Sequence, residues 1–394
     1  MEEGSKEMSK TRTKGLARVQ ELYENRGSRA KELKAQGKKI MGYMCCLAPL
    51  EIMTAADIVP IRILGNVKEP ITRADAHLET IACPYVRSCL DIALKGKYDF
   101  IDGLVVPHTC DNTYALYAIW ASGIVPITPS YHHYIDGPHM TFPASIEYFD
   151  VELGRFKKSL EEFTGKRITN QSLNKAIKLH NQNRALLREL YGMRRQDPPL
   201  LTGIEMTKIL VACRVIPVEE SNELLGEVIE EVKNRRDVPT KKTRLLVYGG
   251  EIDDIALIEL IEESGANVVV DDHCLGVRSF WHDVQVDTSP IHSLSVRYIQ
   301  NVACPRTYKQ RERGYKEDMD NRFGYLLEFA KEYDVKGVIL YIIRYCDTFE
   351  LDAPGVREYL QKAGFPVLHI EDDYSTTTIG QLKTRVQAFL EMID

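Results

Sequence analysis

Short apolar runs alternate with amphipathic helical stretches in the first third of the chain. A buried strand, a helix entered at Pro49 and a second strand come first, and another strand–helix–strand unit follows. Such alternation predicts a parallel sheet with helices on both faces. The strands predicted in this part are residues 40–44, 58–64, 101–106 and 123–128.

From Pro143 to about Arg236 the apolar positions change to a helical period within long, charged segments. Strand–helix alternation then resumes until a closing helix from about Thr378 to Met392. We therefore predict an α/β fold in which two doubly wound, Rossmann-like lobes flank a helical middle region. The predicted divisions are an N-terminal helix (1–38), a first lobe (39–142), a helical middle domain (143–238) and a second lobe (239–394).

The first and last regions share an ordered set of features that indicates two copies of one unit. In each, a glycine and an apolar strand lead to a Cys-Asp pair, Cys110-Asp111 or Cys346-Asp347. A helix follows, and then Gly-x-x-Pro or Gly-x-Pro opens the next strand. Ligands of open α/β sheets bind outside the carboxyl ends of the strands. We therefore expect Cys110 and Cys346 to point into the cleft between the lobes.

A third cysteine has a setting suited to metal binding. Pro84 directly after Cys83 suits the first turn of a helix, where backbone N–H groups and the helix dipole favour a thiolate. Three thiolates without a matching histidine pair suit an iron–sulfur cluster better than zinc. We predict a [4Fe–4S] cluster on Cys83, Cys110 and Cys346, with one iron left open to water or a substrate oxygen.

Composition narrows the functional classes. The chain has 394 residues, 44% hydrophobic and 27% charged, as in ordinary globular proteins. A net charge of −6 argues against nucleic acid as a partner, and no apolar run is long enough to span a membrane. The polar start lacks an apolar signal segment, so we expect a cytoplasmic protein in which nine cysteines are metal ligands, catalytic thiols or core residues before they are disulfides.

Other signals are weaker. The chain has neither a GxxxxGK[ST] loop nor GxGxxG, so we expect no ATP or dinucleotide site. Gly249-Gly250-Glu251 reads as a tight turn after a strand. His132-His133 reads as a solvated or substrate-facing loop pair.

The remaining cysteines leave one alternative open. Cys213 lies inside an apolar run and is expected in the core, and Cys89 falls on a different helical face from Cys83. Cys45 and Cys46 follow a strand and precede Pro49. A second cluster on Cys45, Cys89 and Cys304 is the alternative to a single one.

Several motifs together resemble one family over nearly the whole chain, from about residue 38 onward. They resemble, in order, the 2-hydroxyacyl-CoA dehydratase and benzoyl-CoA reductase subunits. The motifs are Gly42-Tyr43-Met44-Cys45 with Pro49-x-Glu51, Cys83-Pro84-Tyr85-Val86-Arg87-Ser88, Thr109-Cys110-Asp111, Cys346-Asp347, Asp373-Tyr374-Ser375-Thr376 and Gln381-Leu382-Lys383-Thr384-Arg385-Val386.

This resemblance implies a cluster held by Cys83, Cys110 and Cys346, an acyl-CoA substrate, a homologous second subunit in a heterodimer, and a separate ATP-dependent iron–sulfur activator. The function expected first is the cluster-bearing subunit of a benzoyl-CoA-reductase-type enzyme that passes single low-potential electrons to an acyl-CoA thioester. One alternative is an (R)-2-hydroxyacyl-CoA dehydratase subunit, which works through a ketyl radical. Others are a double-cubane reductase of small molecules, although the extra cysteine of those relatives is absent near Lys95, and a cluster-carrying scaffold that only relays electrons.

Reduction of a thioester or ring also needs protons. Glu51 and His108 are the candidate catalytic carriers. Glu51 follows Pro49 at the strand end beside Cys45 and matches the P-x-E of the family pattern, and His108 lies two residues before Cys110. The structural alternative is that Glu51 caps its helix and that His108 braces its loop.

Overall fold

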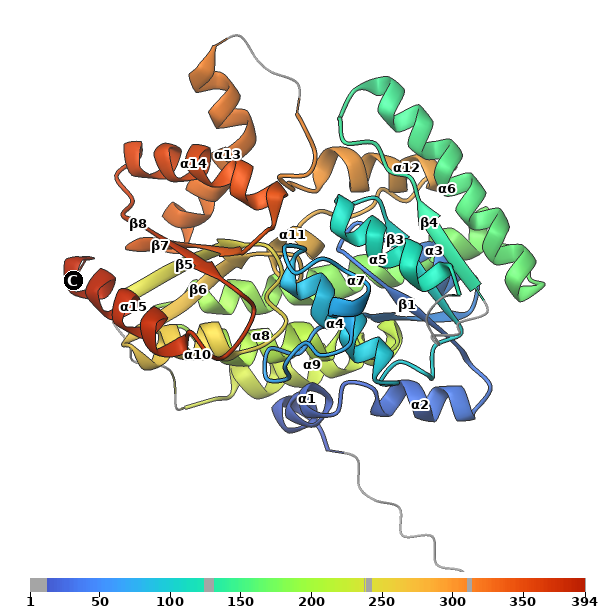
Figure 1. Cartoon of the computed structure of the whole chain (residues 1–394), viewed down its shortest axis with the longest axis horizontal. Coiled ribbons are helices and arrows are strands. Elements are labelled where there is room, and N and C mark those ends of the chain that lie inside the picture. Colours follow the sequence, from blue (N-terminus) through green and yellow to red (C-terminus); the bar gives the residue numbers. More distant parts are fainter. Residues whose placement is uncertain (1–12, 124–130, 237, 239–242, 310–313, 394) are drawn as a thin grey trace, which may run out of the picture.

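Two four-stranded parallel sheets form the centre of the protein (Figure 1). The computed structural model describes residues 13–123, 131–236, 238, 243–309 and 314–393. Strand order is β2-β1-β3-β4 in the first sheet and β6-β5-β7-β8 in the second, so corresponding strands of the two lobes occupy corresponding places. This confirms two doubly wound lobes. The strands are β1 (Lys39–Tyr43), β2 (Ile58–Arg62), β3 (Gly103–Pro107), β4 (Tyr131–Ile135), β5 (Thr243–Gly249), β6 (Ala266–Asp272), β7 (Gly337–Ile343) and β8 (Val367–Asp372).

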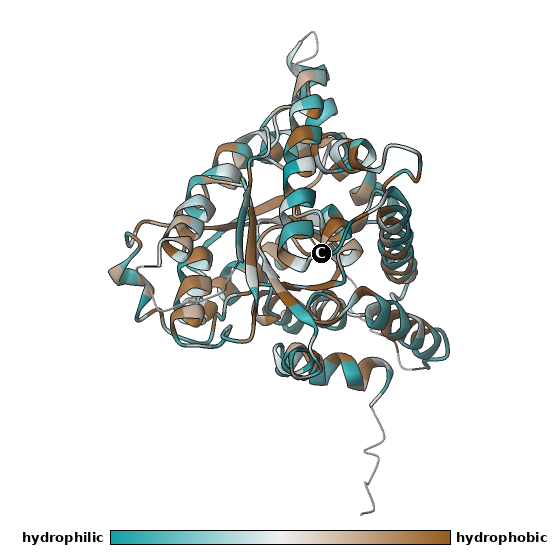
Figure 2. Cartoon of the chain, turned by 90° about the vertical axis from the view of Figure 1, so that its right-hand side faces the viewer, coloured by the Kyte–Doolittle hydropathy of each residue, from teal (hydrophilic) through white to brown (hydrophobic). Residues whose placement is uncertain are grey.

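Helices cover both sheets and join them. In Figure 2 many of the helices carry mixed hydrophilic and hydrophobic residues, as expected for elements with one face in water. The α-helices are α1 (Gly15–Glu24), α2 (Ser28–Ala35), α3 (Leu50–Ala55), α4 (Pro84–Leu94), α5 (Asp111–Ala121), α6 (Pro143–Thr164), α7 (Asn170–Arg194), α8 (Gly203–Ala212), α9 (Val218–Lys233), α10 (Ala256–Glu263), α11 (Val277–Phe280), α12 (Pro290–Val296), α13 (Tyr315–Glu332), α14 (Asp347–Lys362) and α15 (Ile379–Ile393), with a 3₁₀ turn at Ala74–Ala76 and a π-helical turn at Arg297–Asn301.

The fourth strand of the first sheet differs from the prediction. Of the strand predicted at 123–128, residues 124–128 lie outside the described part. The strand observed is β4, in which His132 pairs with Leu104 and His133 with Val105 of β3. The expectation of a histidine loop is therefore wrong: a polar edge strand escaped detection because it lacks an apolar run. Burial lowers the pKa of His133 to about 4, so it remains neutral at physiological pH.

Helix boundaries also differ in places. In place of the single N-terminal helix predicted within 1–38, the structure has two helices, α1 and α2, separated by a short turn that includes Gly27. Helix α14, which precedes β8, begins at Asp347, and Pro354 lies inside it rather than at its first turn. Because the helix begins at Asp347, Cys346 is its N-cap.

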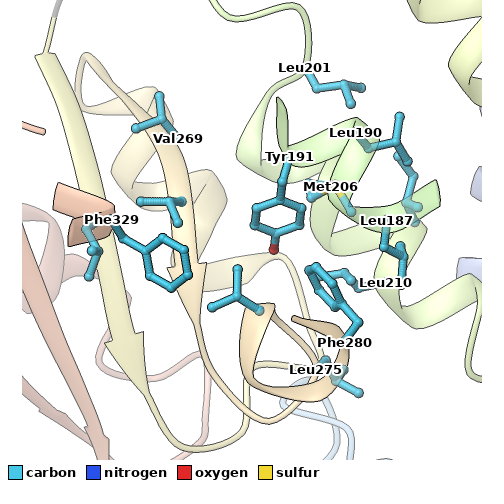
Figure 3. Close-up of a cluster of buried hydrophobic side chains, with 14 of the residues drawn as sticks. Leu187, Leu190, Tyr191, Leu201, Met206, Leu210, Val269, Leu275, Phe280 and Phe329 are labelled. Atoms are coloured by element: carbon cyan, nitrogen blue, oxygen red, sulfur yellow. The ribbon is translucent and has the colours of Figure 1, made fainter. Parts of the chain in front are cut away.

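The helices between the sheets share cores with both of them. Helix α6 packs on β4, while α7 and α8 both pack on β6. Figure 3 shows Tyr191 of α7 between Met206 of α8 and Phe280. Its hydroxyl donates to Asp271 Oδ1 at 2.5 Å. The middle helices thus contribute to the hydrophobic core of the second sheet, and the divisions at 142 and 238 stay predictions.

Direct contacts hold the two lobes with their strand ends facing each other. Arg62 at the end of β2 donates from Nη2 to Glu251 Oε2 at 2.8 Å, just past β5. The Gly65 amide donates to Asp253 Oδ2 at 2.9 Å, and within the second lobe Tyr374 donates to the other oxygen, Asp253 Oδ1, at 2.6 Å. Among the described residues, no helix is long and apolar enough to cross a membrane.

Candidate metal centre

Cys83, Cys110 and Cys346 share one structural position: each is the N-cap of a helix. Cys83 caps α4, with Pro84 in its first turn as predicted, Cys110 caps α5 after β3, and Cys346 caps α14 after β7. We call these residues the helix-cap thiols. A helix N-terminus offers unpaired N–H groups and partial positive charge, which favour a thiolate.

Backbone amides of the first turn lie beside the helix-cap thiols. The amides of Val86 and Tyr85 lower the pKa of the Cys83 thiol, and that of Phe349 lowers the pKa of Cys346, each against a larger effect of burial. The Cys110 thiol accepts a hydrogen bond from the Thr113 amide. Amide donors of this kind stabilise metal-bound sulfur and tune its reduction potential.

The helix-cap thiols lie near one another, because they affect one another electrostatically. Burial raises the pKa of all three thiols, and burial together with the nearby Cys110 thiol brings that of Cys83 to about 12. Cys83 and Cys110 in turn both raise the pKa of Cys346. The amide of Cys83 also donates to Asn112 Oδ1 at 3.1 Å, which ties α4 to α5. The facing of Cys110 and Cys346 across the lobes agrees with the sequence prediction.

The three helix-cap residues form a donor set of sulfur alone. In the described part of the chain, no three His, Cys, Asp or Glu side chains form a group that would hold a single metal ion. In a cubane, iron and sulfide lie between the thiolates, so its ligands stand farther apart than those of one ion. Thiolates alone, without imidazole, are the usual ligands of such clusters.

A second group of cysteines lies beside the first, and we call it the arginine-side thiols. Its members are Cys45, Cys46, Cys274 and Cys304. The Cys46 thiol interacts with those of Cys274 and Cys45, which raise its pKa, and the Cys304 thiol interacts electrostatically with Cys274 and Cys45. The two groups adjoin, because Cys45 also raises the pKa of Cys110.

The surroundings of the arginine-side thiols are cationic. The neighbouring Cys46 and the cationic Arg62 together lower the pKa of Cys45 to about 5, against the effect of burial. Arg278 donates from Nη1 to Cys274 Sγ at 3.8 Å. A narrow cavity opens here; its lining includes Cys45, Cys46, Cys274, Arg62, Arg184 and Arg214.

The remaining cysteines lie apart from both groups. Cys213 is buried at the C-terminal end of α8, which confirms its predicted place in the core. Cys89 is fully buried, and its electrostatic neighbours are Asp253, Glu251 and Arg62 rather than another thiol. The alternative cluster on Cys45, Cys89 and Cys304 therefore lacks one of its three ligands.

Glu51 lies in the first turn of α3 and has no exposed surface. Arg184 of α7 donates to Oε1, and Tyr298 of the π-helical turn donates to Oε2 at 2.8 Å. Burial would raise the pKa of Glu51, but Arg184, His180 and Arg297 hold it at about 2. Glu51 is therefore ionised and lies behind Arg184, which lines the cavity.

His108 lies on the loop that leads to Cys110 and is partly exposed. Its Nδ1 lies 2.9 Å from Asp136 Oδ1, and Tyr148 donates to Asp136 Oδ2 at 2.7 Å. Its ring centroid is 4.5 Å from that of His139, in an edge-to-face arrangement. A carboxylate on Nδ1 fixes the orientation of the ring and leaves Nε2 available for proton exchange.

Sequence reasoning missed Glu251. The residue stands two positions past the end of β5, as Cys45 stands two positions past the end of β1. In each sheet the chain goes from the first strand (β1 or β5) to a neighbour on one side and later returns to a neighbour on the other side. Ligands of doubly wound folds bind at this switch point, and Cys45 and Glu251 follow the strands that form it. If the two lobes are treated as copies, the turn after β5 corresponds to the turn after β1. This correspondence would have marked Glu251, like Cys45, as a residue of the cleft.

Comparison with known proteins places the chain in a family. A family model described as 2-hydroxyglutaryl-CoA dehydratase, D-component, matches residues 45–393. A benzoyl-CoA reductase subunit of Thauera aromatica is 25% identical over 96% of this chain and 97% of its own length. The (R)-phenyllactyl-CoA dehydratase beta subunit of Clostridium sporogenes is 24% identical over 92% of this chain and 94% of its own.

A third relative is also named as a subunit of a dehydratase. The beta subunit of (R)-2-hydroxyglutaryl-CoA dehydratase from Acidaminococcus fermentans is 24% identical over 91% of this chain and 94% of its own length. Both the reductase and the dehydratase relatives are subunits, which implies a partner subunit, and their names support an oxidoreductase or lyase role. Because the family model covers most of the chain, this protein belongs to the 2-hydroxyglutaryl-CoA dehydratase D-component family.

Proposed function

We propose that this chain is the [4Fe–4S]-bearing subunit of a benzoyl-CoA-reductase-type enzyme and passes single low-potential electrons to an acyl-CoA thioester. The observation that carries the proposal is the meeting of three cysteine-capped helix N-termini at the facing ends of two parallel sheets. A bound cluster would supply one-electron chemistry at this point. The chain's own residues place each thiol at a helix N-terminus and keep the site largely away from water.

The same proposal includes its partners. A homologous second subunit and an ATP-dependent iron–sulfur activator would complete the enzyme. The relatives are themselves named as subunits, which supports the first of these partners. The absence of a P-loop sequence in this chain supports a separate source of ATP hydrolysis.

The dehydratase alternative shares the site and differs in the acyl group. Relatives of both kinds match at nearly equal identity, so the site residues rather than the names must decide. The direct test is turnover of the assembled enzyme with benzoyl-CoA and, separately, with an (R)-2-hydroxyacyl-CoA. Loss of hydroxyl from the second substrate without reduction of the first would replace the reductase by the dehydratase.

One observation favours a second candidate, a double-cubane reductase of small molecules. The arginine-side thiols adjoin the helix-cap thiols, and the buried Nη1 of Arg297 has no hydrogen-bond partner. Arg297 interacts electrostatically with Cys46 and would stabilise additional negative charge there. Additional iron and sulfide bound to these thiols would carry such charge.

Metal analysis separates the two candidates. Anaerobically purified protein should contain about four iron and four sulfide per chain. About eight iron per chain, halved by Cys274→Ala, would replace the single cubane by the double one. Protein that folds but retains neither iron nor sulfide after anaerobic reconstitution would overturn both.

A further inference from the structure

Glu251 is a buried carboxyl at the facing ends of the two sheets, and it is 6% exposed. Its Oε2 accepts the hydrogen bond from Arg62, whereas its buried Oε1 has no hydrogen-bond partner. A buried carboxylate oxygen without a donor costs free energy that a bound proton removes. The geometry thus gives Glu251 one oxygen fixed by a cation and one oxygen open to a proton.

Charged and titratable groups surround Glu251 from several elements. Burial raises its pKa most, Arg62 lowers it, and Asp253 and Cys45 raise it again, so that it lies above the ordinary value. Glu251 in turn raises the pKa of the Cys83 thiol, which places its charge within electrostatic range of the helix-cap thiols. The groups that face it are Arg62 (β2), Tyr43 (β1), Cys45 (after β1), Cys83 (before α4), Tyr85 and Cys89 (α4), Asp253 (its own loop) and His273 (after β6).

We propose that Glu251 takes up one proton when an electron enters the cluster on Cys83, Cys110 and Cys346, and holds that proton beside the site. This inference rests on the proposed function, because it requires a cluster on these thiols. In the step, an external low-potential donor gives up one electron, the cluster gains it, and one proton from water binds to a Glu251 carboxylate oxygen. The net charge of the buried site is then unchanged.

The direction follows from electrostatics. An added negative charge near a buried carboxylate disfavours its ionised form, and low-dielectric surroundings strengthen that effect. Arg62 keeps the carboxyl oriented in both states through Oε2. Arg62 also stabilises the Cys45 thiolate, so one arginine lies between a thiol with a lowered pKa and a carboxyl with a raised pKa. Neighbouring groups whose pKa values are shifted in opposite directions are typical of sites that move protons.

The test is the pH dependence of the cluster's midpoint potential, measured on the cluster-loaded full-length chain by redox titration. One proton per electron should lower the midpoint by about 59 mV per pH unit, since a tenfold change in equilibrium corresponds to that value for one electron. Glu251→Gln should flatten this slope and retain the iron content. Glu262→Gln is a matched control, because Glu262 is also buried with a raised pKa but bonds to the Gly203 amide.

The outcomes are distinct. A flat midpoint in cluster-loaded wild-type protein overturns the inference and leaves the proposed function standing, whereas a chain that binds no cluster overturns the proposed function. A full slope in Glu251→Gln assigns the proton to another group and also overturns the inference. If Glu251→Gln does not fold, infrared difference spectra of the wild type decide: reduction must produce a protonated carboxyl band that shifts in D₂O, and its absence overturns the inference.

Discussion

Cys110 and Cys346 occupy the same position in the two lobes, each as N-cap of the helix that follows the third strand of its sheet. Cys110 raises the pKa of the Cys346 thiol, so the two side chains lie near each other although they come from different sheets. Because one thiol comes from each lobe, the distance between them depends on how the two lobes face each other.

Replacing Cys83, Cys110 or Cys346 by alanine should each abolish cluster binding, because two thiolates do not retain a cubane. Cys213→Ala is the control, since Cys213 lies in the core at the end of α8. Iron and sulfide analysis after anaerobic purification is the measurement. Normal iron content in Cys346→Ala would contradict a site shared by both lobes.

Gly249→Ala tests how β5 and β7 approach each other beside the site. A Cβ at residue 249 would lie 2.3 Å from the Tyr341 carbonyl oxygen, a backbone atom that cannot turn aside. We expect destabilisation of about 1–3 kcal/mol and reduced iron content, because β7 leads directly to Cys346. Chemical denaturation and metal analysis measure the two effects. Gly154→Ala is the control, because a Cβ at residue 154 on α6 would have no atom within 4 Å. This substitution should stabilise the protein by about 0.5–1 kcal/mol.

Glu51 should contribute to stability in a pH-dependent way. Its pKa is lowered from 4.5 to about 2, so its contribution, roughly 3 kcal/mol, is present above about pH 4.5 and is lost as pH falls toward 2. Glu51→Gln leaves Arg184 buried without its carboxylate and should remove this contribution at neutral pH. Urea unfolding at several pH values measures it. Glu263→Gln, which breaks an exposed pair with Lys383, should change stability by less than about 0.5 kcal/mol.

The same variant tests the proposed catalytic role of Glu51. If Glu51 carries a proton to substrate, Glu51→Gln keeps its iron and accepts electrons yet loses most turnover in the assembled enzyme. A stable variant with wild-type turnover would leave Glu51 with the structural role that its bonds to Arg184 and Tyr298 describe.

The sequence predicted the lobes and the helix-cap thiols because both depend on local patterns. Apolar strands are visible as runs, and Cys-Pro or Cys-Asp before a helix indicates an N-cap. The strand β4 was missed because His132 and His133 interrupt its apolar pattern at a sheet edge. Cys45 and Cys304 were already grouped in the alternative second cluster. Glu251 was missed, and Cys46 and Cys274 were not joined to that pair, because their meeting depends on contacts between residues far apart in the chain, such as Arg62 with Glu251.

His108 is the last candidate carrier, and the structure supplies a matched control for it. His108 pairs through Nδ1 with Asp136 at 2.9 Å, and His292 pairs through Nδ1 with Asp150 at 2.8 Å on α12, which packs against α6. We expect His108→Gln to keep its iron content and to lower turnover of the assembled enzyme by about 10²–10⁴-fold, the usual contribution of general acid–base catalysis. His292→Gln should leave turnover unchanged.

Asp136→Asn should have an intermediate effect, because it keeps the contact with His108 but removes the charge that orients the ring. The measurement is steady-state turnover with the partner subunit and activator present, together with iron analysis of each variant. Equal losses in His108→Gln and His292→Gln would show that surface His–Asp pairs affect the fold rather than the reaction. Loss of iron in His108→Gln alone would mean that His108 braces the Cys110 loop, to which the Arg306 side chain is also tied through the His108 carbonyl.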